Sequence, residues 1–434
     1  MLTETAMEDN QSINKLWKFN TLEENTELQS RKKNKKPLTV RGALSMLNGN
    51  VNPIDNRTVI PLAHGDPSPF DSFRASADAE DSVVTALRSA SFNGYATTFG
   101  LSSTRKAVAN YVSKDVPYKV SADDVYLTSG CKHAIQAAIS AIAFIPNSNI
   151  LLPKPTFALY DAIADFYGLQ VRHYNLLQER NWEIDIGSVQ DLADDNTVAV
   201  VVINPGNPTG SVYSYQHLQN VAKAARKLGL LVIADEVYEH IVFGRNPFVR
   251  MAVFASLVPV LTLSSLSKRW IVPGWRIGWL VTTDPNGVLQ KSQFIERIKA
   301  FLIISSEPST FIQAAVPEII EKVDKEFFSK CINVLQQDAD MVFDKLADIP
   351  YITCPYKPEG SMFLMVKLNI SMLDGIQDDT DFCMKLANQE KVIILPGSTV
   401  GMENWLRITF AIEPPVLEEG LERVKVFCQR NAKA

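Results

Sequence analysis

The segment LTLSSLSKRWIVPGWRIG, residues 261–278, decides how the chain is expected to fold. It begins with a short apolar run that predicts a buried strand, and the run breaks at Ser265 and Ser267 just before Lys268. Lys268 is therefore expected at the carboxyl end of that strand, the edge at which open α/β sheets bind their ligands. Arg276 follows eight residues later, after a Pro-Gly turn. One lysine and one arginine thus flank a single strand and its loop.

This lysine and arginine together match the chemistry of one cofactor. A lysine in a dry pocket loses its proton more readily, so its free amine can condense with an aldehyde. An arginine beside it can bind a phosphate through two parallel hydrogen bonds. An aldehyde and a phosphate together suggest pyridoxal 5'-phosphate. A solvated lysine and a surface arginine would explain this segment alone equally well.

Composition describes an ordinary globular protein and argues against several classes. The 434 residues can form two domains with substantial cores, and 46% of them are hydrophobic. A net charge of -5 gives no electrostatic reason to expect nucleic acid or an anionic membrane as a partner. The five cysteines are scattered without a C-x-x-C pair, and the five histidines are isolated. We therefore expect a reducing compartment, no disulfides and no metal site.

The N-terminal residues predict a cytoplasmic location. MLTETAMEDN carries acids where a signal or transit peptide carries bases, and no apolar core follows it. The longest apolar stretch, Ala134 to Ile145, is interrupted by Gln136 and Ser140 and is too short to span a bilayer. We expect no membrane partner.

Apolar runs and amphipathic segments alternate through the middle of the chain. The apolar runs lie at 125–128, 149–153, 197–204, 230–235 and 260–265, and the clearest helical segments lie at 132–143 and 215–229. Strands that alternate with helices predict an α/β fold with a mainly parallel sheet covered on both faces. The sequence has no internal repeat and no G-x-G-x-x-G motif for a dinucleotide.

Three parts of the chain are expected to form separate units. Residues 1–36 are polar and lack a sustained period, so we interpret them as a flexible N-terminal arm, with a solvated basic run at its end rather than a nucleic-acid patch. Residues 76–324 are expected to form a large cofactor-binding domain around the sheet. The segments 37–75 and 325–434 contain amphipathic helices and isolated strands, which predict one smaller, discontinuous α+β domain.

Two motifs with site chemistry follow predicted strands. Gly130 and Cys131 open a helix directly after the strand 125–128, and backbone amides at such a helix start bind phosphate. Lys132 either adds a charge there or points to solvent. Asn207 lies in a loop with two Asn-Pro pairs. This loop is either a rigid turn that donates an amide to an oxygen of the cofactor ring or an irregular loop without a ligand.

Two further strand ends carry candidate residues. Asp235 directly follows an apolar run, and a carboxylate buried there needs a cationic partner such as a protonated pyridine nitrogen. The alternative for Asp235 is a helix N-cap. Tyr238 is expected to reach the ring hydroxyl, and Phe157, which follows two prolines, either stacks on the ring or belongs to the core.

Taken together, these segments resemble the class I aminotransferases of fold type I, in the tyrosine aminotransferase branch, and look most like the plant members and their carbon-sulfur lyase relatives. The motifs that carry the resemblance are S-L-S-K-R-W-I-V-P-G-W-R-I-G, N-P-G-N-P-T-G-S, A-D-E-V-Y and W-L-R-I-T-F-A, in matching order and spacing. It extends from about Leu38 to the C-terminus. It implies pyridoxal 5'-phosphate, a homodimer, and a large domain with a mainly parallel seven-stranded sheet.

The resemblance also implies a role for each site residue. Lys268 is implied as the lysine that binds the cofactor covalently and moves protons, with Asp235 on the pyridine nitrogen. The ring contacts are implied for Asn207, Tyr238 and Phe157, the phosphate contacts for Gly130, Cys131, Lys132, Ser265 and Arg276, and the substrate contacts for Gly65, Asn207, Phe363 and Arg407. Tyr95 corresponds to a tyrosine that reaches the phosphate of the partner subunit. Lys132 departs from the branch, which usually has a hydroxyl or amide residue there.

The predicted activity is the transfer of an amino group from an aromatic L-amino acid, tyrosine first and also phenylalanine, to a 2-oxo acid such as 2-oxoglutarate or an aryl analogue. Phe363 and the lack of an obvious second arginine for a distal carboxylate favour flat apolar side chains. The alternative is a carbon-sulfur lyase with the same cofactor that acts on cysteine conjugates. A catalytically silent scaffold would have lost Lys268, Asp235 or Arg407, and all three are present.

Overall fold

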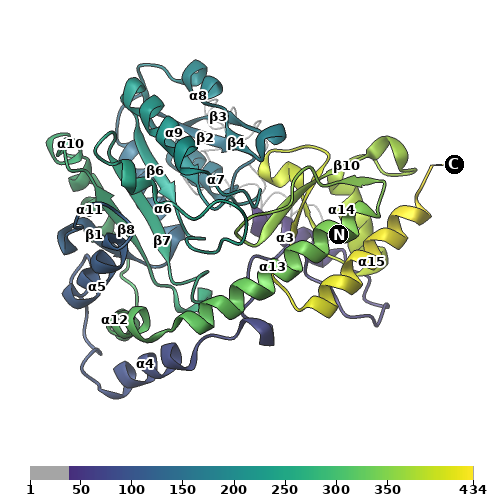
Figure 1. Cartoon of the computed structure of the whole chain (residues 1–434), viewed down its shortest axis with the longest axis horizontal. Helices are drawn as coiled ribbons and strands as arrows, with labels where there is room; N and C mark the ends of the chain where they lie inside the picture. Colours follow the sequence, from purple (N-terminus) through teal and green to yellow (C-terminus); the bar gives the residue numbers. More distant parts are fainter. Residues whose placement is uncertain (1–38, 434) are drawn as a thin grey trace, which may run out of the picture. The chain divides into compact units, whose positions relative to one another are not determined.

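The computed structural model describes residues 39–433 (Figure 1). The flexible arm and the basic run predicted within residues 1–36 lie outside the described residues. None of the helices between residues 39 and 433 has both the length and the apolar composition that a membrane span requires. The cytoplasmic location stays a prediction.

An eight-stranded sheet forms the larger of two sheets. Its strands, in spatial order, are β1 (Val125–Thr128), β8 (Gly278–Thr283), β7 (Val260–Ser265), β6 (Leu231–Asp235), β5 (Thr197–Ile203), β2 (Asn149–Lys154), β3 (Gln170–Leu177) and β4 (Glu183–Ile184). The strands from β7 to β3 run parallel, whereas β8 and β4 are antiparallel to their neighbours. The predicted fold class is confirmed. The sheet has one strand more than predicted, because the two-residue β4 pairs with the end of β3.

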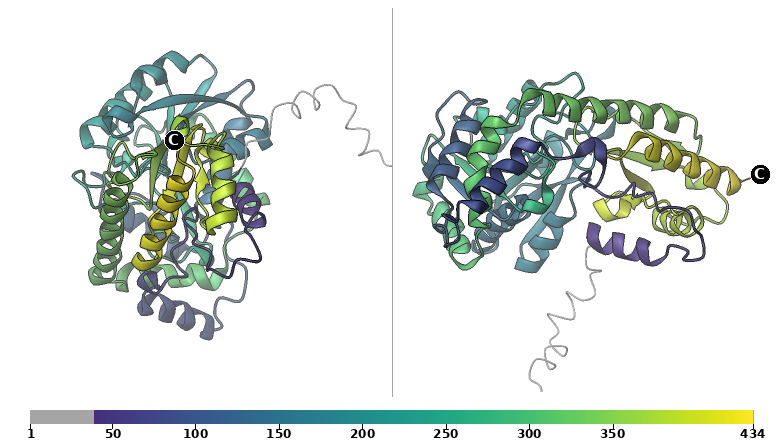
Figure 2. Two further views of the ribbon diagram at one scale, coloured as in Figure 1. Left: turned by 90° about the vertical axis from the view of Figure 1, so that its right-hand side faces the viewer. Right: turned by 90° about the horizontal axis from the view of Figure 1, so that it is seen from below.

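Helices cover both faces of this sheet because alternate side chains of its strands enter different cores (Figures 1 and 2). Val200 and Val202 of β5 pack in the core that includes α9, whereas Val201 and Ile203 pack in the core that includes α6, α7 and α11. A third core joins α4, α5 and α12 to β1 and β8. These helices are α4 (Ala77–Arg88), α5 (Ser102–Ser113), α6 (Cys131–Ala143), α7 (Leu159–Tyr167), α8 (Ile186–Leu192), α9 (Tyr215–Leu228), α10 (Val288–Lys291), α11 (Phe294–Ile304) and α12 (Thr310–Lys322).

A smaller antiparallel sheet is formed mainly by the C-terminal part of the chain. Its strands, in spatial order, are β11 (Leu395–Pro396), β12 (Trp405–Thr409), β10 (Phe363–Leu368) and β9 (Ile352–Thr353). The remaining helices are α3 (Val40–Gly49), α13 (Lys325–Ala347), α14 (Asp379–Glu390) and α15 (Pro414–Arg430). The N-terminal segment joins this sheet, since the Ile60 amide donates to the Lys391 carbonyl at 2.8 Å and the Thr409 amide to the Leu62 carbonyl at 2.8 Å. The domain boundaries given above stay predictions.

Candidate active site

A cavity of about 720 Å³ lies at the carboxyl edge of the large sheet. The predicted site residues that line it are Gly65, Cys131, Lys132, Phe157, Asn207, Asp235, Tyr238, Ser265, Lys268, Arg276, Phe363 and Arg407. Gly130 lies directly beside it, against Arg276. Tyr95 does not line it, and its side chain is fully exposed. Segments far apart in the sequence meet here because parallel strands end at the same edge of a sheet.

Asp235 is a buried carboxylate without a cation within the described residues. It is the last residue of β6, and a turn rather than a helix follows it, so the N-cap alternative is wrong. Its Oδ2 accepts a hydrogen bond from the Tyr160 hydroxyl at 2.9 Å, and its Oδ1 lies 3.7 Å from the Cys131 sulfur and accepts from the Val237 amide at 3.3 Å. Burial raises the pKa of Asp235. A cationic group of a ligand would stabilise its ionised form.

Lys268 follows β7 and is half-buried at the cavity wall. Its ammonium donates to the Gly65 carbonyl and lies 5.9 Å from the centroid of the Tyr238 ring. Loss of hydration lowers the Lys268 pKa to about 8, against the opposing effect of Asp66, and the nearby arginines lower it further. Lys268 can therefore become a free amine near neutral pH, as its sequence context predicts.

One end of the cavity combines a helix start with an arginine. Gly130 has a φ of 82° and is the N-cap of α6, whose first turn contains no acid. The positive φ favours glycine at this position, and a Cβ there would lie 2.4 Å from an Arg276 nitrogen, so another residue would also displace the guanidinium. Arg276 donates to the carbonyls of Pro273 and Ser129, each at 2.8 Å. The amides that open α6 and this guanidinium form a cradle for an anion.

Arg407 is a buried guanidinium without a carboxylate partner among residues 39–433. It lies in β12 and donates to the Asn207 side chain at 3.2 Å and to the Ala63 carbonyl at 2.8 Å, while its Nε has no partner in the described chain. Its guanidinium carbon lies 4.3 Å from the centroid of the Phe363 ring. Burial lowers the Arg407 pKa to about 10. A carboxylate that enters the cavity would restore the missing interactions.

An aromatic wall surrounds these charges. The rings of Tyr238 and Phe363 meet edge to face, with centroids 6.0 Å apart, and Phe157 contributes a half-buried ring to the lining. Burial raises the pKa of Tyr238, which keeps its hydroxyl protonated. A Cβ at Gly65 would lie 2.6 Å from Phe363, so glycine leaves room for that ring.

Tyr160, Asp66 and Arg41 are among the residues at the site that the sequence did not predict. Tyr160 donates to Asp235, Asp66 lines the cavity and its charge raises the pKa of Lys268, and Arg41 at the start of α3 lines the cavity. Of these residues, only Tyr160 could have been found from the sequence, because it is a tyrosine on the buried face of an amphipathic helix. The sequence showed no obvious second arginine for a distal carboxylate; Arg41, which comes from a helix that the motifs do not include, lines the cavity.

Comparisons with known proteins give the class of protein. Residues 57–424 match the family model for aminotransferase class I and II. A nicotianamine aminotransferase from Oryza sativa subsp. japonica is 52% identical over 396 residues, which covers 91% of this chain and 80% of that protein. An S-alkyl-thiohydroximate lyase from Arabidopsis thaliana is 50% identical over 396 residues, with 91% and 86% covered. The solved tyrosine aminotransferase from Leishmania infantum has a TM-score of 0.83 at 30% identity, with 87% and 93% covered.

The chain belongs to the class I and II aminotransferase family. It is an aminotransferase that depends on pyridoxal 5'-phosphate and acts on amino acids and 2-oxo acids, and the predicted resemblance is confirmed. The chemistry of the cavity fits this cofactor, because Asp235 lacks a cation, Lys268 has a lowered pKa, and the start of α6 with Arg276 can hold a phosphate.

Proposed function

We propose that this enzyme moves the amino group of an aromatic L-amino acid, tyrosine first and also phenylalanine, to a 2-oxo acid in a ping-pong cycle. The observation that carries this proposal is the aromatic surface of Phe363 and Tyr238 directly beside the buried Arg407. A flat apolar side chain placed there gains about 25 cal/mol per Å² of apolar surface removed from water. The similarity to a solved tyrosine aminotransferase supports the same substrate class.

The cavity residues that the sequence predicted each have a proposed task. Bound pyridoxal 5'-phosphate supplies an aldehyde and a ring that withdraws electrons from the substrate Cα. Asp235 keeps the ring nitrogen protonated, Asn207 and Tyr238 bind the ring oxygen, and Phe157 stacks on the ring. The phosphate contacts are Gly130, Cys131, Lys132, Ser265 and Arg276. Arg407 binds the substrate α-carboxylate, with Gly65 behind it.

Lys268 is the proposed covalent anchor and the group that moves the proton from the substrate Cα. Its lowered pKa supports this task, because a base must be unprotonated near the working pH. The Lys268→Ala variant should lose the visible absorbance of the covalently bound cofactor and several decades of turnover. If the purified variant keeps both the absorbance and the turnover, Lys268 is neither the covalent anchor nor the group that moves the proton.

We also propose a homodimer in which Tyr95 contacts the cofactor phosphate of the partner subunit. The support is that the Tyr95 side chain is fully exposed and does not line the cavity of its own chain. Mixing Tyr95→Phe and Lys268→Ala dimers, each inactive, should restore activity in heterodimers that have one intact site. If subunit exchange is confirmed and activity does not recover, Tyr95 serves the active site of its own chain.

Carbon-sulfur lyase activity is the second candidate function. The 50% identity to an S-alkyl-thiohydroximate lyase supports it. The two reactions differ after the Cα proton is lost, because elimination needs a leaving group on Cβ that tyrosine lacks. An S-aryl cysteine conjugate offers both routes in one assay. We expect mainly the 2-oxo acid with its thioether intact, and faster transamination of tyrosine than of aspartate. Excess thiol and pyruvate, with negligible use of tyrosine, would establish the lyase instead.

A further inference from the structure

We propose that His133 is a positioning residue for the cofactor phosphate, because it holds the start of α6 and Arg276 in the arrangement that receives an anion. The inference rests on the phosphate contacts proposed above and adds a residue that does not itself line the cavity. His133 is the third residue of α6. Its side chain is buried and packs against Phe301 of α11, with ring centroids 5.5 Å apart.

The two ring nitrogens of His133 have different partners, which fix the tautomer. Nδ1 accepts a hydrogen bond from the Ser129 amide at 3.1 Å, so Nδ1 carries no proton. Nε2 lies 3.0 Å from the Ser305 hydroxyl oxygen, and that hydroxyl donates to the Leu302 carbonyl at 3.3 Å. Nε2 is therefore the donor to Ser305, and the ring is neutral.

Ser129 transmits this contact to the anion cradle. Its amide is held by His133, and its carbonyl accepts from Arg276 at 2.8 Å. Its hydroxyl donates to the Ser306 carbonyl at 3.4 Å. Rotation of these peptide groups would remove one of the carbonyls that orient the guanidinium. His133 therefore acts on Arg276 through Ser129.

The same contact leaves the first helical amides available to a ligand. The amides at the start of a helix have no partner within the helix. The Gly130 amide turns back to the Thr128 carbonyl at 2.7 Å. Cys131 and Lys132 follow as the first two residues of α6, and their amides remain for a phosphate. The His133 ring binds the preceding amide from the buried side of the helix, so it does not occupy the cradle.

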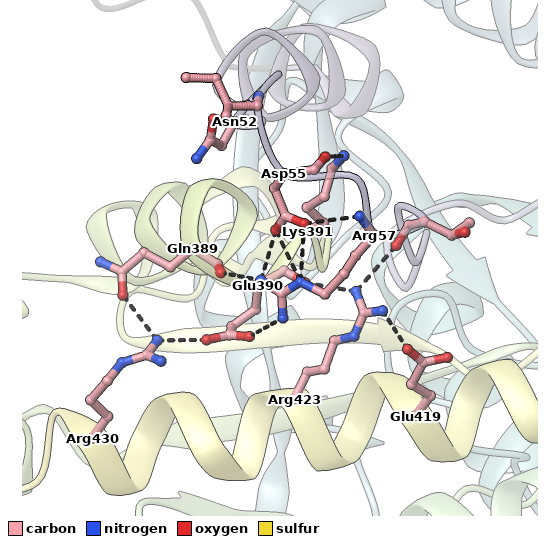
Figure 3. A network of polar contacts seen from close by, with 11 residues as sticks. Asn52, Asp55, Arg57, Gln389, Glu390, Lys391, Glu419, Arg423 and Arg430 are labelled. Carbon is pink, nitrogen blue, oxygen red and sulfur yellow. Dashed lines mark hydrogen bonds and ion pairs between the residues drawn. The ribbon is translucent and has the colours of Figure 1, made fainter.

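A neutral ring is a suitable link beside an anion site. Elsewhere the chain fastens a segment with ion pairs, since Arg57 donates to Glu390 at 2.8 Å and Arg430 donates to the same carboxylate at 2.6 Å (Figure 3). A carboxylate at the start of α6 would repel a phosphate and compete for Arg276. His133 makes the link without a charge, and the first turn of α6 contains no acid.

The protonation state of His133 decides whether the link exists. Burial lowers the pKa of His133, which keeps the ring neutral near neutral pH. The ring contacts are Ser129, Ser305 and Phe301, none of which titrates in this range, and Lys132 beside it on the helix is exposed. A second proton would place a donor at Nδ1, opposite the donor of the Ser129 amide. The link is therefore present above the pKa of His133 and is lost as the pH falls through it.

The test compares how tightly the full-length enzyme holds pyridoxal 5'-phosphate and pyridoxal, which lacks the phosphate. His133→Phe keeps a ring against Phe301 and removes both nitrogens. We expect its Kd for pyridoxal 5'-phosphate to rise about tenfold and its Kd for pyridoxal to change less than about twofold. His133→Asn retains an acceptor near the position of Nδ1 and should recover most of the loss. Release of the bound aldehyde on dilution, followed by its absorbance, gives both constants.

His217→Phe is the matched control. His217 is as buried as His133, at 8% exposure, and its Nε2 accepts from the Ile184 amide at 3.0 Å, away from the cavity. His217→Phe should leave the ratio of the two Kd values unchanged, whatever it does to Tm. Arg276→Met is the reference for the phosphate site itself and should remove most of the preference for the phosphorylated ligand.

Equal changes for the two ligands in His133→Phe, or an unchanged Kd for pyridoxal 5'-phosphate, would overturn the proposal. The same selective loss in His217→Phe would also overturn it. If Arg276→Met leaves the ratio unchanged as well, the phosphate site proposed at α6 is itself wrong. A loss in Arg276→Met alone rejects only the role of His133.

The pH profile tests the inference without the phenylalanine variant. Between pH 8 and pH 5 the wild-type preference for the phosphorylated ligand should fall more steeply than that of His133→Asn, which has no ring to protonate. Protonation of the phosphate itself affects both proteins alike. Superimposable profiles for the two proteins would contradict a role for the neutral His133 ring.

Discussion

Asp235 and Glu236 are neighbours in the sequence, both are buried acids, and they meet opposite surroundings. Asp235 lines the cavity without a cation among the described residues. Glu236 points away from it and pairs with the buried Arg250 at 3.0 Å, while its other oxygen accepts from the Met251 amide at 2.8 Å. The cluster around Arg250 also includes Glu239 and Asp115.

The buried arginines repeat this contrast. Arg250 contacts three carboxylates, whereas Arg407 contacts none in the described chain. A buried charge costs several kcal/mol unless it is paired. We propose that a ligand supplies the counter-charge for the charges that the fold leaves unpaired at the cavity. We infer that Arg250 and Glu236 serve stability, and Arg407 and Asp235 serve binding and catalysis.

Among the variants that test the contrast between paired and unpaired buried charges, we expect Asp235→Ala to have the largest effect on activity. In the proposed role of Asp235, the substitution lets the ring nitrogen of the cofactor lose its proton, so the transition state loses stabilisation that the bound substrate does not need. We expect kcat to fall about a thousandfold, roughly 4 kcal/mol, with little change in KM or in Tm. Steady-state kinetics and thermal unfolding measure both. A raised KM with unchanged kcat would contradict the assignment.

Substituting each buried arginine by methionine tests the contrast directly. Arg250→Met leaves buried acids unpaired, so the free energy of unfolding should fall by about 3–5 kcal/mol with kcat changed little in the folded fraction. Arg407→Met should leave the unfolding free energy nearly unchanged and lower kcat/KM for amino acids about a hundredfold. Denaturant titration and kinetics on both variants provide the check. If Arg250→Met instead lowers kcat/KM and Arg407→Met lowers the unfolding free energy, then Arg250 serves function and Arg407 serves stability.

Patterns in the sequence predicted the parts of the site that follow strands. Arg407 and Gly65, which long-range packing brings to the cavity, were implied only by the family resemblance, and Arg41 was missed. Lys268, Asp235 and Asn207 follow apolar runs, so their common edge could be inferred without coordinates. Arg41 belongs to the site only because α3 packs on β11 and α14, which come from the other end of the chain. Segments 37–75 and 325–434 were expected to share one domain, but no local pattern near residue 41 indicates that its side chain lines the cavity.

The strand count and one buried acid show the same limit. The two-residue β4 has no pattern of its own, so an eighth strand could not be predicted. Asp338 did leave a signal, because it falls on the apolar stripe of α13 between Leu335 and Val342, where a polar residue is unexpected. The residues that the fold packs against it were not predictable.

Asp338 is a possible exception to the rule that unpaired buried charges mark the ligand site, because it is buried and unpaired yet does not line the cavity. Neither of its carboxylate oxygens has a hydrogen-bond partner within residues 39–433, and burial, aided by the charge of Glu413, raises its pKa to about 7. Glu413 is itself held by the amide and hydroxyl of Ser72, at 2.7 and 2.8 Å. We therefore expect Asp338 to avoid the cost of an unpaired charge by holding its proton.

The sign of the resulting pH dependence follows from proton binding. Between about pH 4 and 7 the folded state retains a proton on Asp338 that the unfolded state has released, so this residue lowers the free energy of unfolding as the pH rises through that window. The unfolding free energy of Asp338→Asn relative to the wild type should therefore rise between pH 5 and pH 8, by on the order of 2 kcal/mol. Thermal unfolding from pH 5 to 8 measures the difference. If the unfolding free energies of the two proteins change in parallel with pH, the Asp338 carboxylate is stabilised in its ionised form. The lack of a partner for a buried acid would then not be evidence of a ligand site.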